Sequence, residues 1–324
     1  SVLSALESTN GDPSGVSLDA RKQLALDAFQ TTAAYDAAVS NELDDRFNSP
    51  DVPSRIHVAS DTGTSLRYGE NPHQPAAFYP AASATGPKGL AAAIQHGGKE
   101  LSFNNYLDLD GALRIARGFL IDTDEKRPYG CVVIKHTNPC GAAIDATQVG
   151  AWENALASDP ESAFGCVIAF THTVEKATAE AIGGHFLECI IAPGYDDDAL
   201  EILSEKKNRR MLTLDDFTPR EDEVRIRQLD GGWVAQVQGP PSVDWSAVKC
   251  VTKAPADDDL VALARFGSTV LSEVKSNSIV LVAQTETGFA TVGVGPGQTS
   301  RVEAVRIAAR RAGERAKGSM MVSD

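Results

Sequence analysis

Strand-sized apolar runs alternate with helical patterns along most of this chain, and this alternation limits the fold more than any other feature. The runs that predict strands lie at 131–135, 166–170 and 189–191. Apolar residues at helical spacing lie between and around them, at 107–119, 152–157 and 174–186. Strands that alternate with helices predict an α/β fold, in which helices cover the faces of a sheet.

The same alternation continues in the second half of the chain. Further strands are expected at 225–229 and 233–236, a helix at 260–274, a hairpin formed by 279–283 and 290–294, and a helix at 301–316. A chain of 324 residues is long for one simple domain. Two lobes are therefore the natural expectation.

The first 54 residues differ from the rest. Ser17 is a plausible N-cap for a helix that continues to about residue 43, and residues 48–54 contain two prolines among small polar residues, as linkers do. One helix in about 45 residues is too little for an independent core. We expect residues 1–54 to be the end of a preceding domain and a linker.

Charge and composition exclude several function classes. The net charge is −14, which disfavours nucleic acids and anionic membranes as partners. No run approaches the roughly 20 apolar residues of a membrane span, and no signal peptide is visible at the start.

The five cysteines are odd in number and widely spaced, which indicates buried free thiols in a reducing compartment. The acidic clusters at 196–198 and 257–259 favour adaptation to high salt over an ordinary acidic surface.

Lys135 and His136 end an apolar strand just before a turn rich in Pro and Gly, at 137–141. Active-site residues favour the carboxyl ends of strands in α/β sheets. Two cations repel each other, so a lysine beside a histidine favours the neutral imidazole, which can act as a general base. A solvated strand end is the alternative at this point.

The same segment partly resembles a zinc-binding motif. Zinc-dependent deaminases carry a His-x-Glu pair and a later Pro-Cys-x-x-Cys. Here Asn138 stands where the Glu is needed, and Ala143 stands in place of the second Cys after Cys140. One His and one Cys cannot fill a tetrahedral zinc site, so no metal is expected.

Three further polar segments are candidates for binding. Residues 66–74 place Arg67 and Tyr68 in a loop dense in hydrogen-bond donors, which suits a phosphate or an amide-bearing ring. Asn277 is either a helix C-cap or a residue that recognises an amide. The glycine-rich loop 293–301 enters a helix at Arg301, but it matches no phosphate-binding motif. Gly165 ends a turn at 159–165 that is uninformative by itself.

Taken in order, these segments resemble a known family. They are LRYGENPHQ at 66–74, GKELSFNNYLDLDGAL at 98–113, VIKHTNPCGAAI at 133–144, DPESAFGCVIAF at 159–170, IIAPGYDDDAL at 190–200, KSNSIVL at 275–281 and VGPGQTSRVEAVRIA at 294–308. Together they are similar to the AICAR transformylase domain of the bifunctional AICAR transformylase/IMP cyclohydrolase family. AFQTTAAYDAAVSNEL at 28–43 resembles the junction with the cyclohydrolase domain.

The resemblance implies a fold, a reaction and partners. The fold would be two zinc-free, cytidine-deaminase-like lobes at about 55–205 and 206–324, in a cytoplasmic homodimer with active sites at the subunit interface. The reaction would transfer a formyl group from 10-formyltetrahydrofolate to the 5-amino group of AICAR, giving FAICAR in purine biosynthesis. The parent chain would also be an IMP cyclohydrolase.

The resemblance also implies roles for single residues. His136 would be the general base on the amine, and Lys135 would stabilise the oxyanion and assist protonation of the leaving folate nitrogen. The AICAR site would be formed by Arg67 on the phosphate, by Tyr68, Gly165 and Glu188, and by Asn277 near the carboxamide. Arg301 would lie near the folate or the formyl group.

One departure from the family pattern matters. The family continues beyond Ser323-Asp324 with aromatic and arginine residues, so the second lobe is expected to be incomplete here. Two other hypotheses for the function remain. The protein would be a related zinc nucleoside deaminase, or a zinc-free module of the same fold that binds without catalysis.

Overall fold

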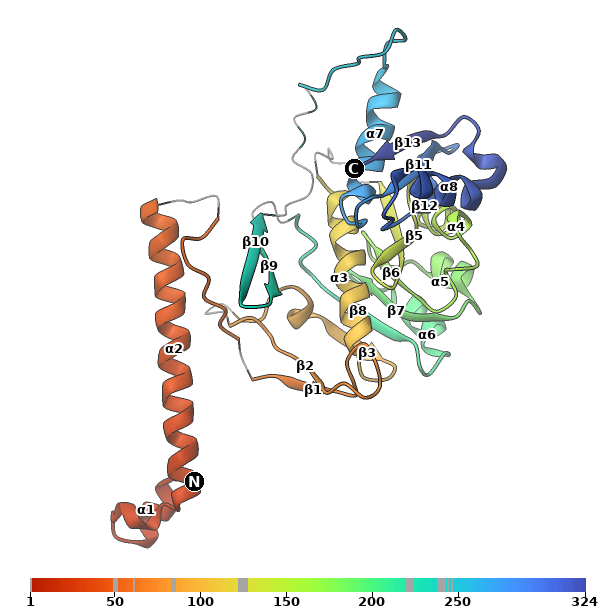
Figure 1. Ribbon diagram of the computed structural model, residues 1–324. Coiled ribbons are helices and arrows are strands. Elements are labelled where there is room, and N and C mark those ends of the chain that lie inside the picture. The colour runs from red at the N-terminus through yellow and green to blue at the C-terminus, as the bar shows by residue number, and fades with distance from the viewer. Residues whose placement is uncertain are drawn as a thin grey trace. The chain divides into compact units, whose positions relative to one another are not determined.

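The computed structural model describes residues 2–48, 52–60, 62–82, 86–121, 128–219, 224–237, 243, 245 and 247–324. The chain divides into two compact units (Figure 1). One consists of Ser1–Gly63 with Tyr79–Pro87, and the other of Thr64–Phe78 with Lys88–Asp324. The second unit contains every candidate site residue.

The first unit is built around one long helix. It contains α1 (Val2–Ser8), the short η1 (Pro13–Gly15) and α2 (Leu18–Asn48). Ser17 caps α2 as expected, because its hydroxyl accepts a hydrogen bond from the Ala20 amide at 3.2 Å. No residue of α2 is buried, so this helix contributes no packed core of its own.

The second unit alternates strands and helices, as the sequence predicts. Its elements are β1 (Thr64–Leu66), β2 (Ala76–Phe78), η2 (Gly89–Ala92), β3 (Ile94–Gly97), α3 (Phe103–Gly118), β4 (Tyr129–Lys135), β5 (Asn138–Asp145), α4 (Gln148–Ser158), β6 (Cys166–Phe170), α5 (Lys176–Ile182), β7 (Leu187–Ala192), α6 (Asp197–Ser204), β8 (Arg210–Thr213), β9 (Val224–Leu229), β10 (Gly232–Val237), α7 (Asp258–Leu271), β11 (Ile279–Gln284), β12 (Phe289–Gly295), α8 (Arg301–Ala312), η3 (Gly313–Ala316) and β13 (Met320–Ser323).

Nine of these strands form one mixed sheet. Their order is β13-β11-β12-β5-β4-β6-β7-β8-β3, in which the β6–β7 and β7–β8 pairs are parallel and the other pairs antiparallel. The expected α/β class is confirmed, as a mixed rather than a parallel sheet. Among the helices of the described ranges, none is long and apolar enough to cross a membrane.

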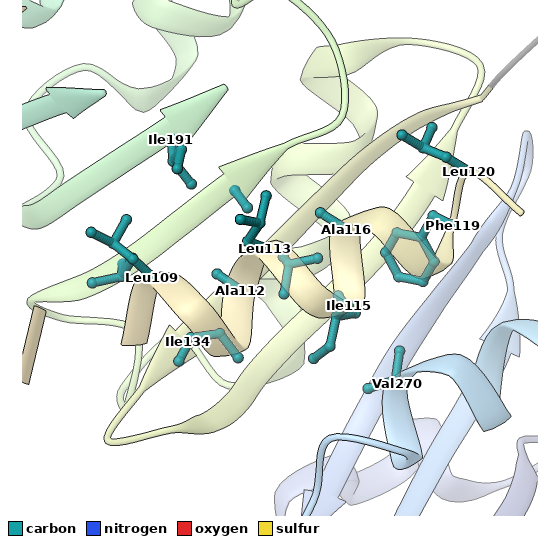
Figure 2. Packing of buried hydrophobic residues seen from close by; sticks show 14 of the residues in the cluster. Leu109, Ala112, Leu113, Ile115, Ala116, Phe119, Leu120, Ile134, Ile191 and Val270 are labelled. Carbon is teal, nitrogen blue, oxygen red and sulfur yellow. The ribbon is translucent and has the colours of Figure 1, made fainter. Parts of the chain in front are cut away.

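The core forms because the strands are apolar on both faces. In β4, Val132 and Ile134 belong to one buried cluster and Cys131 and Val133 to another, as the two-residue period of a strand requires. Figure 2 shows the first cluster, where the apolar face of α3 lies against the sheet and next to Val270 of α7. Helices α4, α5 and α6 cover the second cluster, and α8 packs on β11 and β12 through a third.

The sheet contains an internal repeat. The order α3-β4-β5-α4-β6 recurs as α7-β11-β12-α8-β13, and in each set the first strand of the hairpin lies between its two partners. The sets meet where β5 and β12 pair antiparallel, at Phe289 with Ile144 and Ala290 with Ala143. Two sets of elements with the same order therefore form one continuous sheet.

One local prediction was wrong. Residues 138–141 are not part of a Pro/Gly turn but form the first half of β5, and the turn is only His136 and Thr137. Gly141 is needed here for packing, since a Cβ on it would lie 2.0 Å from the Ala155 carbonyl oxygen of α4. The glycine therefore lets a helix approach the strand closely.

The N-terminus of α3 offers a test of how local capping stabilises the unit. The Ser102 hydroxyl accepts from the Asn105 amide at 3.2 Å, and the Asn105 side chain accepts from the Ser102 amide at 3.0 Å. Because both residues are buried, Ser102→Ala should lower the free energy of unfolding by about 1–2 kcal/mol in urea titrations. Ser272→Ala is the control, since its hydroxyl is exposed and the change should stay within about 0.5 kcal/mol. Equal effects would contradict this account.

Candidate active site

Six of the eight candidate residues lie at one end of the nine-stranded sheet. The registers bring the carboxyl ends of β3, β4, β12 and β13 to the same end as the amino ends of β5, β6, β7, β8 and β11. We call this the polar end, and it carries Lys135, His136, Gly165, Glu188, Asn277 and Arg301. Residues from both halves of the internal repeat meet there.

Active-site residues of α/β sheets favour the carboxyl ends of strands, and the candidate residues here follow this rule only in part. It applies to β4, which ends at Lys135, but the parallel strands β6, β7 and β8 present their amino ends at the polar end. The reason is that β4 runs antiparallel to β6. The site is thus not the carboxyl-end crevice of a parallel sheet.

His136 lies on a tight and unusual turn. Lys135 pairs with Asn138, so the β4–β5 hairpin is closed by two residues, and His136 and Thr137 have φ angles of +52° and +61°. Such two-residue turns need positive φ at both positions and favour Asn and Gly. Here they carry a histidine and a β-branched threonine, for which positive φ is costly. Both side chains are exposed, so the imidazole is open to solvent.

Asp108 of α3 holds this turn. One carboxylate oxygen accepts from the Thr137 amide at 2.6 Å, and the other accepts from the His136 amide at 3.3 Å. Asp108 is only 8% exposed, and burial raises its pKa although both amide hydrogen bonds and the nearby His136 lower it. Asp108 carries no motif that marks it in the sequence.

The Lys135 ammonium points to the turn that precedes β6. It donates a hydrogen bond to the Phe164 carbonyl oxygen at 2.7 Å. The next residue, Gly165, has a φ of +76° and donates its amide to the Phe186 carbonyl at 2.9 Å. A Cβ there would also lie 3.3 Å from the Phe186 ring, so only glycine fits without strain. Lys135 and Gly165 are therefore brought together.

Glu188 is held by an arginine that the sequence analysis missed. Its carboxylate lies 2.7 Å from the Arg210 guanidinium, whose side chain is 3% exposed while that of Glu188 is 36% exposed. Arg210 also donates to the Glu100 carbonyl at 3.0 Å. The buried arginine thus orients a carboxylate that remains accessible at the polar end.

Asn277 lies in a loop rather than at a helix end, because α7 ends at Leu271. Its side-chain amide donates to the Gln298 carbonyl at 3.0 Å, and its backbone pairs with Gln298 in both directions. Within the described ranges, the Asn277 side-chain oxygen accepts no hydrogen bond. That oxygen is therefore free to accept from a ligand.

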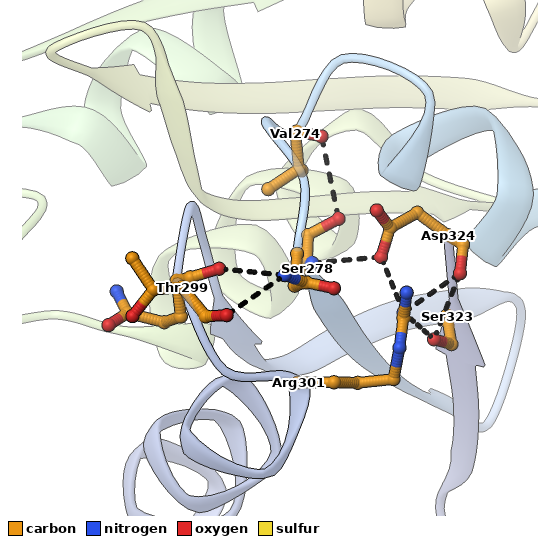
Figure 3. Close-up of polar contacts among 8 residues, drawn as sticks. Val274, Ser278, Thr299, Arg301, Ser323 and Asp324 are labelled. Atoms are coloured by element: carbon orange, nitrogen blue, oxygen red, sulfur yellow. Dashed lines mark hydrogen bonds and ion pairs between the residues drawn. The ribbon is translucent and has the colours of Figure 1, made fainter.

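Arg301 begins α8 and is tied to the end of β13. Its guanidinium donates to the Asp324 carboxylate at 2.7 Å, and the same oxygen accepts from the Ser278 amide at 2.9 Å. Figure 3 shows Asp324 between these two groups. The Arg301 side chain is still 45% exposed, so part of the guanidinium can contact a ligand.

The Asp324 contacts predict how stability depends on pH. Hydrogen bonds from the Ser276 side chain and the Ser278 amide, together with Arg301, lower the pKa of Asp324 from 3.8 to about 2. The carboxylate therefore stabilises the fold above about pH 4, and this contribution is lost as the pH falls toward 2. Asp324→Asn should flatten the pH dependence of the urea midpoint over that interval. An unchanged slope would contradict the assignment.

Arg67 and Tyr68 lie on the loop between β1 and β2. The loop is closed by a hydrogen bond from the Gly69 amide to the Gln74 carbonyl at 2.7 Å, and the Arg67 guanidinium carbon lies 5.4 Å from the centre of the Tyr68 ring. Phe78 of β2 stacks on Tyr106 of α3 at 4.1 Å, which anchors the hairpin to that helix. In the described part of the chain, no hydrogen bond or ion pair joins this loop to Lys135 or His136.

A cleft of about 430 Å³ opens beside the His136 turn. It is lined by residues of α3, of the β4–β5 turn and of the loops around Asn277, namely Leu107, Asp110, Gly111, Thr137, Asn138, Arg225, Glu273, Lys275, Pro296 and Gly297. The Arg225 guanidinium lies 2.8 Å from the Glu273 carboxylate. Burial raises the pKa of Glu273, while Arg225 lowers it. Sequence patterns gave no sign of these charged lining residues.

The geometry agrees poorly with zinc at the Cys140 motif. Cys140 is buried in β5, and burial raises the pKa of its thiol to about 12. His136 is exposed on the turn. Over the described ranges, no three His, Cys, Asp or Glu side chains gather as metal ligands. A zinc-free site remains a prediction.

Comparison with known proteins gives a consistent family. The family model described as the AICARFT/IMPCHase bienzyme matches residues 1–311. The bifunctional purine biosynthesis protein PurH of Dinoroseobacter shibae is 42% identical over 315 residues, which cover 94% of this chain and 58% of that relative. The PurH proteins of Desulfitobacterium hafniense and Sorangium cellulosum are 40% and 41% identical, and each alignment covers 95% of this chain and 59% of the relative.

The matched relatives are longer than this sequence, which spans about 60% of their length. The family match nevertheless covers almost all of the residues described above, including the polar end and the Arg67 loop. The chain belongs to the AICARFT/IMPCHase bienzyme family.

Proposed function

We propose that the protein transfers a formyl group from 10-formyltetrahydrofolate to the 5-amino group of AICAR, giving FAICAR and tetrahydrofolate. The observation that carries the proposal is the polar end itself. Lys135 ends a strand there and His136 begins the constrained turn that follows, beside a cleft of about 430 Å³, and Asn277 and Arg301 lie at the same end of the sheet. Family membership supports this reaction over the other chemistry that such a site could perform.

The reaction needs a base and a polarised carbonyl. The amine nitrogen of AICAR attacks the formyl carbon, and the bond between that carbon and the folate nitrogen breaks. The amine loses a proton, which His136 accepts, and the folate nitrogen gains one with the help of Lys135. The amine is a poor nucleophile because its lone pair is delocalised, so proton removal and oxyanion stabilisation are the two contributions that matter.

Substrate contacts follow from the same arrangement. Arg67 would bind the AICAR phosphate, since its guanidinium is exposed and pairs with no carboxylate in the described ranges. The free side-chain oxygen of Asn277 suits the amide hydrogens of the AICAR carboxamide. Tyr68, Gly165 and Glu188 would line the AICAR site, and Arg301 would lie near the folate. Zinc has no part in this proposal.

Several wider features belong to the same proposal. The internal repeat supports two cytidine-deaminase-like lobes at about 55–205 and 206–324, because each set has the same strand order. The bifunctional relatives support an IMP cyclohydrolase in the same protein, to which residues 1–54 would belong. We also place the enzyme in the cytoplasm as a homodimer, in which the Arg67 loop of one subunit could serve the polar end of the other.

The test is a spectroscopic assay of tetrahydrofolate release by the full-length protein, with AICAR present or omitted. The proposal predicts release only when AICAR is present, in equal amounts with FAICAR. Release without AICAR, or binding of AICAR with no release, would contradict it. Metal analysis in the same preparation separates the alternative, since stoichiometric zinc would favour a deaminase.

A further inference from the structure

The turn that carries His136 is strained, although the Thr137 hydroxyl and the Asn138 side-chain amide both donate to the His136 carbonyl, at 2.7 Å and 2.9 Å. His136 and Thr137 both have positive φ, at +52° and +61°, in the region that β-branched residues avoid most strongly. Backbone conformations of this kind persist only where the surrounding structure enforces them. The contacts around the turn must therefore supply what Asn-Gly would supply in an ordinary hairpin.

Asp108 supplies those contacts from outside the hairpin. Its two carboxylate oxygens accept from the two turn amides, at 2.6 Å from Thr137 and 3.3 Å from His136. The turn residues lie 28 and 29 residues further along the chain, so these contacts are tertiary. One buried carboxylate thus spans both amides of the turn.

Helix α3 fixes the position of that carboxylate. Leu109 and Ala112, which follow Asp108 on the helix, are fully buried in the core, and Ser102 and Asn105 cap the helix reciprocally. Figure 2 shows this face of α3 in contact with the core. Asp108 therefore connects the turn to a helix that is packed into the core, and Lys135 at the end of β4 immediately precedes the same turn.

We propose that Asp108 is a positioning residue for formyl transfer, which orients His136 and Lys135 by holding the turn between β4 and β5. The proposal rests on the proposed function, because it assigns Asp108 a part in that reaction. Asp108 touches the backbone of the turn and acts through the two side chains. Catalysis needs such groups to be held close to the productive geometry, and small displacements lower the rate strongly.

Asp108→Asn tests the proposal in the full-length protein. An amide has one oxygen, so one turn amide keeps its acceptor while the other faces an NH₂ group and loses its bond. We expect kcat to fall on the order of 10- to 100-fold, with little change in KM for AICAR, because Asp108 holds catalytic groups and not substrate. A rise in KM with kcat unchanged would overturn the proposal.

A second substitution separates turn holding from a direct role in chemistry. Glycine adopts positive φ without strain, so a turn with Thr137→Gly should depend less on Asp108. In a double-mutant cycle, the kcat loss caused by Asp108→Asn should be several-fold smaller in the Thr137→Gly background. An equal loss in both backgrounds would show that Asp108 acts in some way other than by holding the turn.

Asp145→Asn is the matched control for stability. Asp145 is 4% exposed and accepts from the Thr147 amide at 3.1 Å and the Thr287 hydroxyl at 2.8 Å, but it lies at the opposite end of the sheet. The Asp145→Asn variant should lower Tm about as much as Asp108→Asn does, but it should retain the wild-type kcat. If Asp145→Asn lowered kcat equally, the effect of Asp108→Asn would be general destabilisation.

Hydrogen exchange of the His136 and Thr137 amides distinguishes a failure of the proposed function from a failure of the positioning role of Asp108. Asp108→Asn should speed exchange at these two amides and leave the amides of β4 protected, whether or not the protein has the proposed activity. If the wild-type protein releases no tetrahydrofolate, the proposed function fails, but a faster exchange still shows that Asp108 holds the turn. If the wild type is active and Asp108→Asn keeps full kcat, the positioning role is wrong.

Discussion

Replacing His136 with alanine in the full-length protein should lower the rate of formyl transfer by about 100- to 10,000-fold, the usual contribution of a general base. The side chain is exposed, so the loss would come from chemistry and not from unfolding. The rate of AICAR-dependent tetrahydrofolate release measures it, and circular dichroism melting confirms that the fold is retained.

His136→Asn is the sharper variant of this test. Asparagine tolerates positive φ better than most residues, so it should preserve the turn at least as well as histidine while removing the imidazole. Both variants should lose activity to a similar extent. If His136→Asn kept more than about a tenth of the wild-type rate, His136 would be a turn residue and not a base.

Lys135→Met should lower kcat by about 100- to 1,000-fold, the range found when a group that stabilises an oxyanion is removed. Methionine fills a similar volume without the charge, and the lost hydrogen bond to the Phe164 carbonyl lies partly in solvent. Stability should therefore change little. The experiment compares kcat and KM for both substrates in single-turnover and steady-state assays.

Lys135→Arg is the matched control for charge. Arginine keeps the cation but cannot place it as a compact point charge, so its loss should be intermediate between wild type and Lys135→Met. Equal losses in both variants would show that geometry and not charge is decisive at this position. Full activity of Lys135→Met would remove Lys135 from the mechanism.

Sequence patterns predicted the elements of this fold well where apolar periodicity was strong. The strands at 131–135, 166–170 and 189–191 correspond to β4, β6 and β7, and the hairpin at 279–283 and 290–294 corresponds to β11 and β12. These runs are buried on both faces, so their pattern is nearly continuous and easy to read. The expected helix at 174–186 is shorter, because α5 ends at Ile182 before Gly183.

The first half of β5 shows why local signals fail. Pro139 and Gly141 favour a turn by composition, yet both lie in a strand that is paired with β4. The decisive contact is tertiary, since Gly141 is in the strand to let α4 approach closely. Likewise, the joining of β5 to β12 involves residues about 145 positions apart, which no local pattern reports.

The sequence suggested candidate site residues but not the residues that hold them in place. Lys135 and His136 were suggested by a strand end and Asn277 by a polar segment with two interpretations, whereas roles for Gly165, Glu188 and Arg301 came only through family resemblance. Asp108 and Arg210 were missed because each acts on partners far away in sequence. A carboxylate next to the apolar residues Leu109 and Ala112 on the buried face of α3 was the visible signal for Asp108.

The most direct measurement is a crystal structure of the full-length protein with AICAR bound at the polar end. We expect an imidazole nitrogen of His136 within about 2.6–3.2 Å of the 5-amino nitrogen, directly or through one water, with Asp108 still bonded to the turn amides. AICAR bound elsewhere, or its amine well beyond reach of this ring and of any bridging water, would contradict the account.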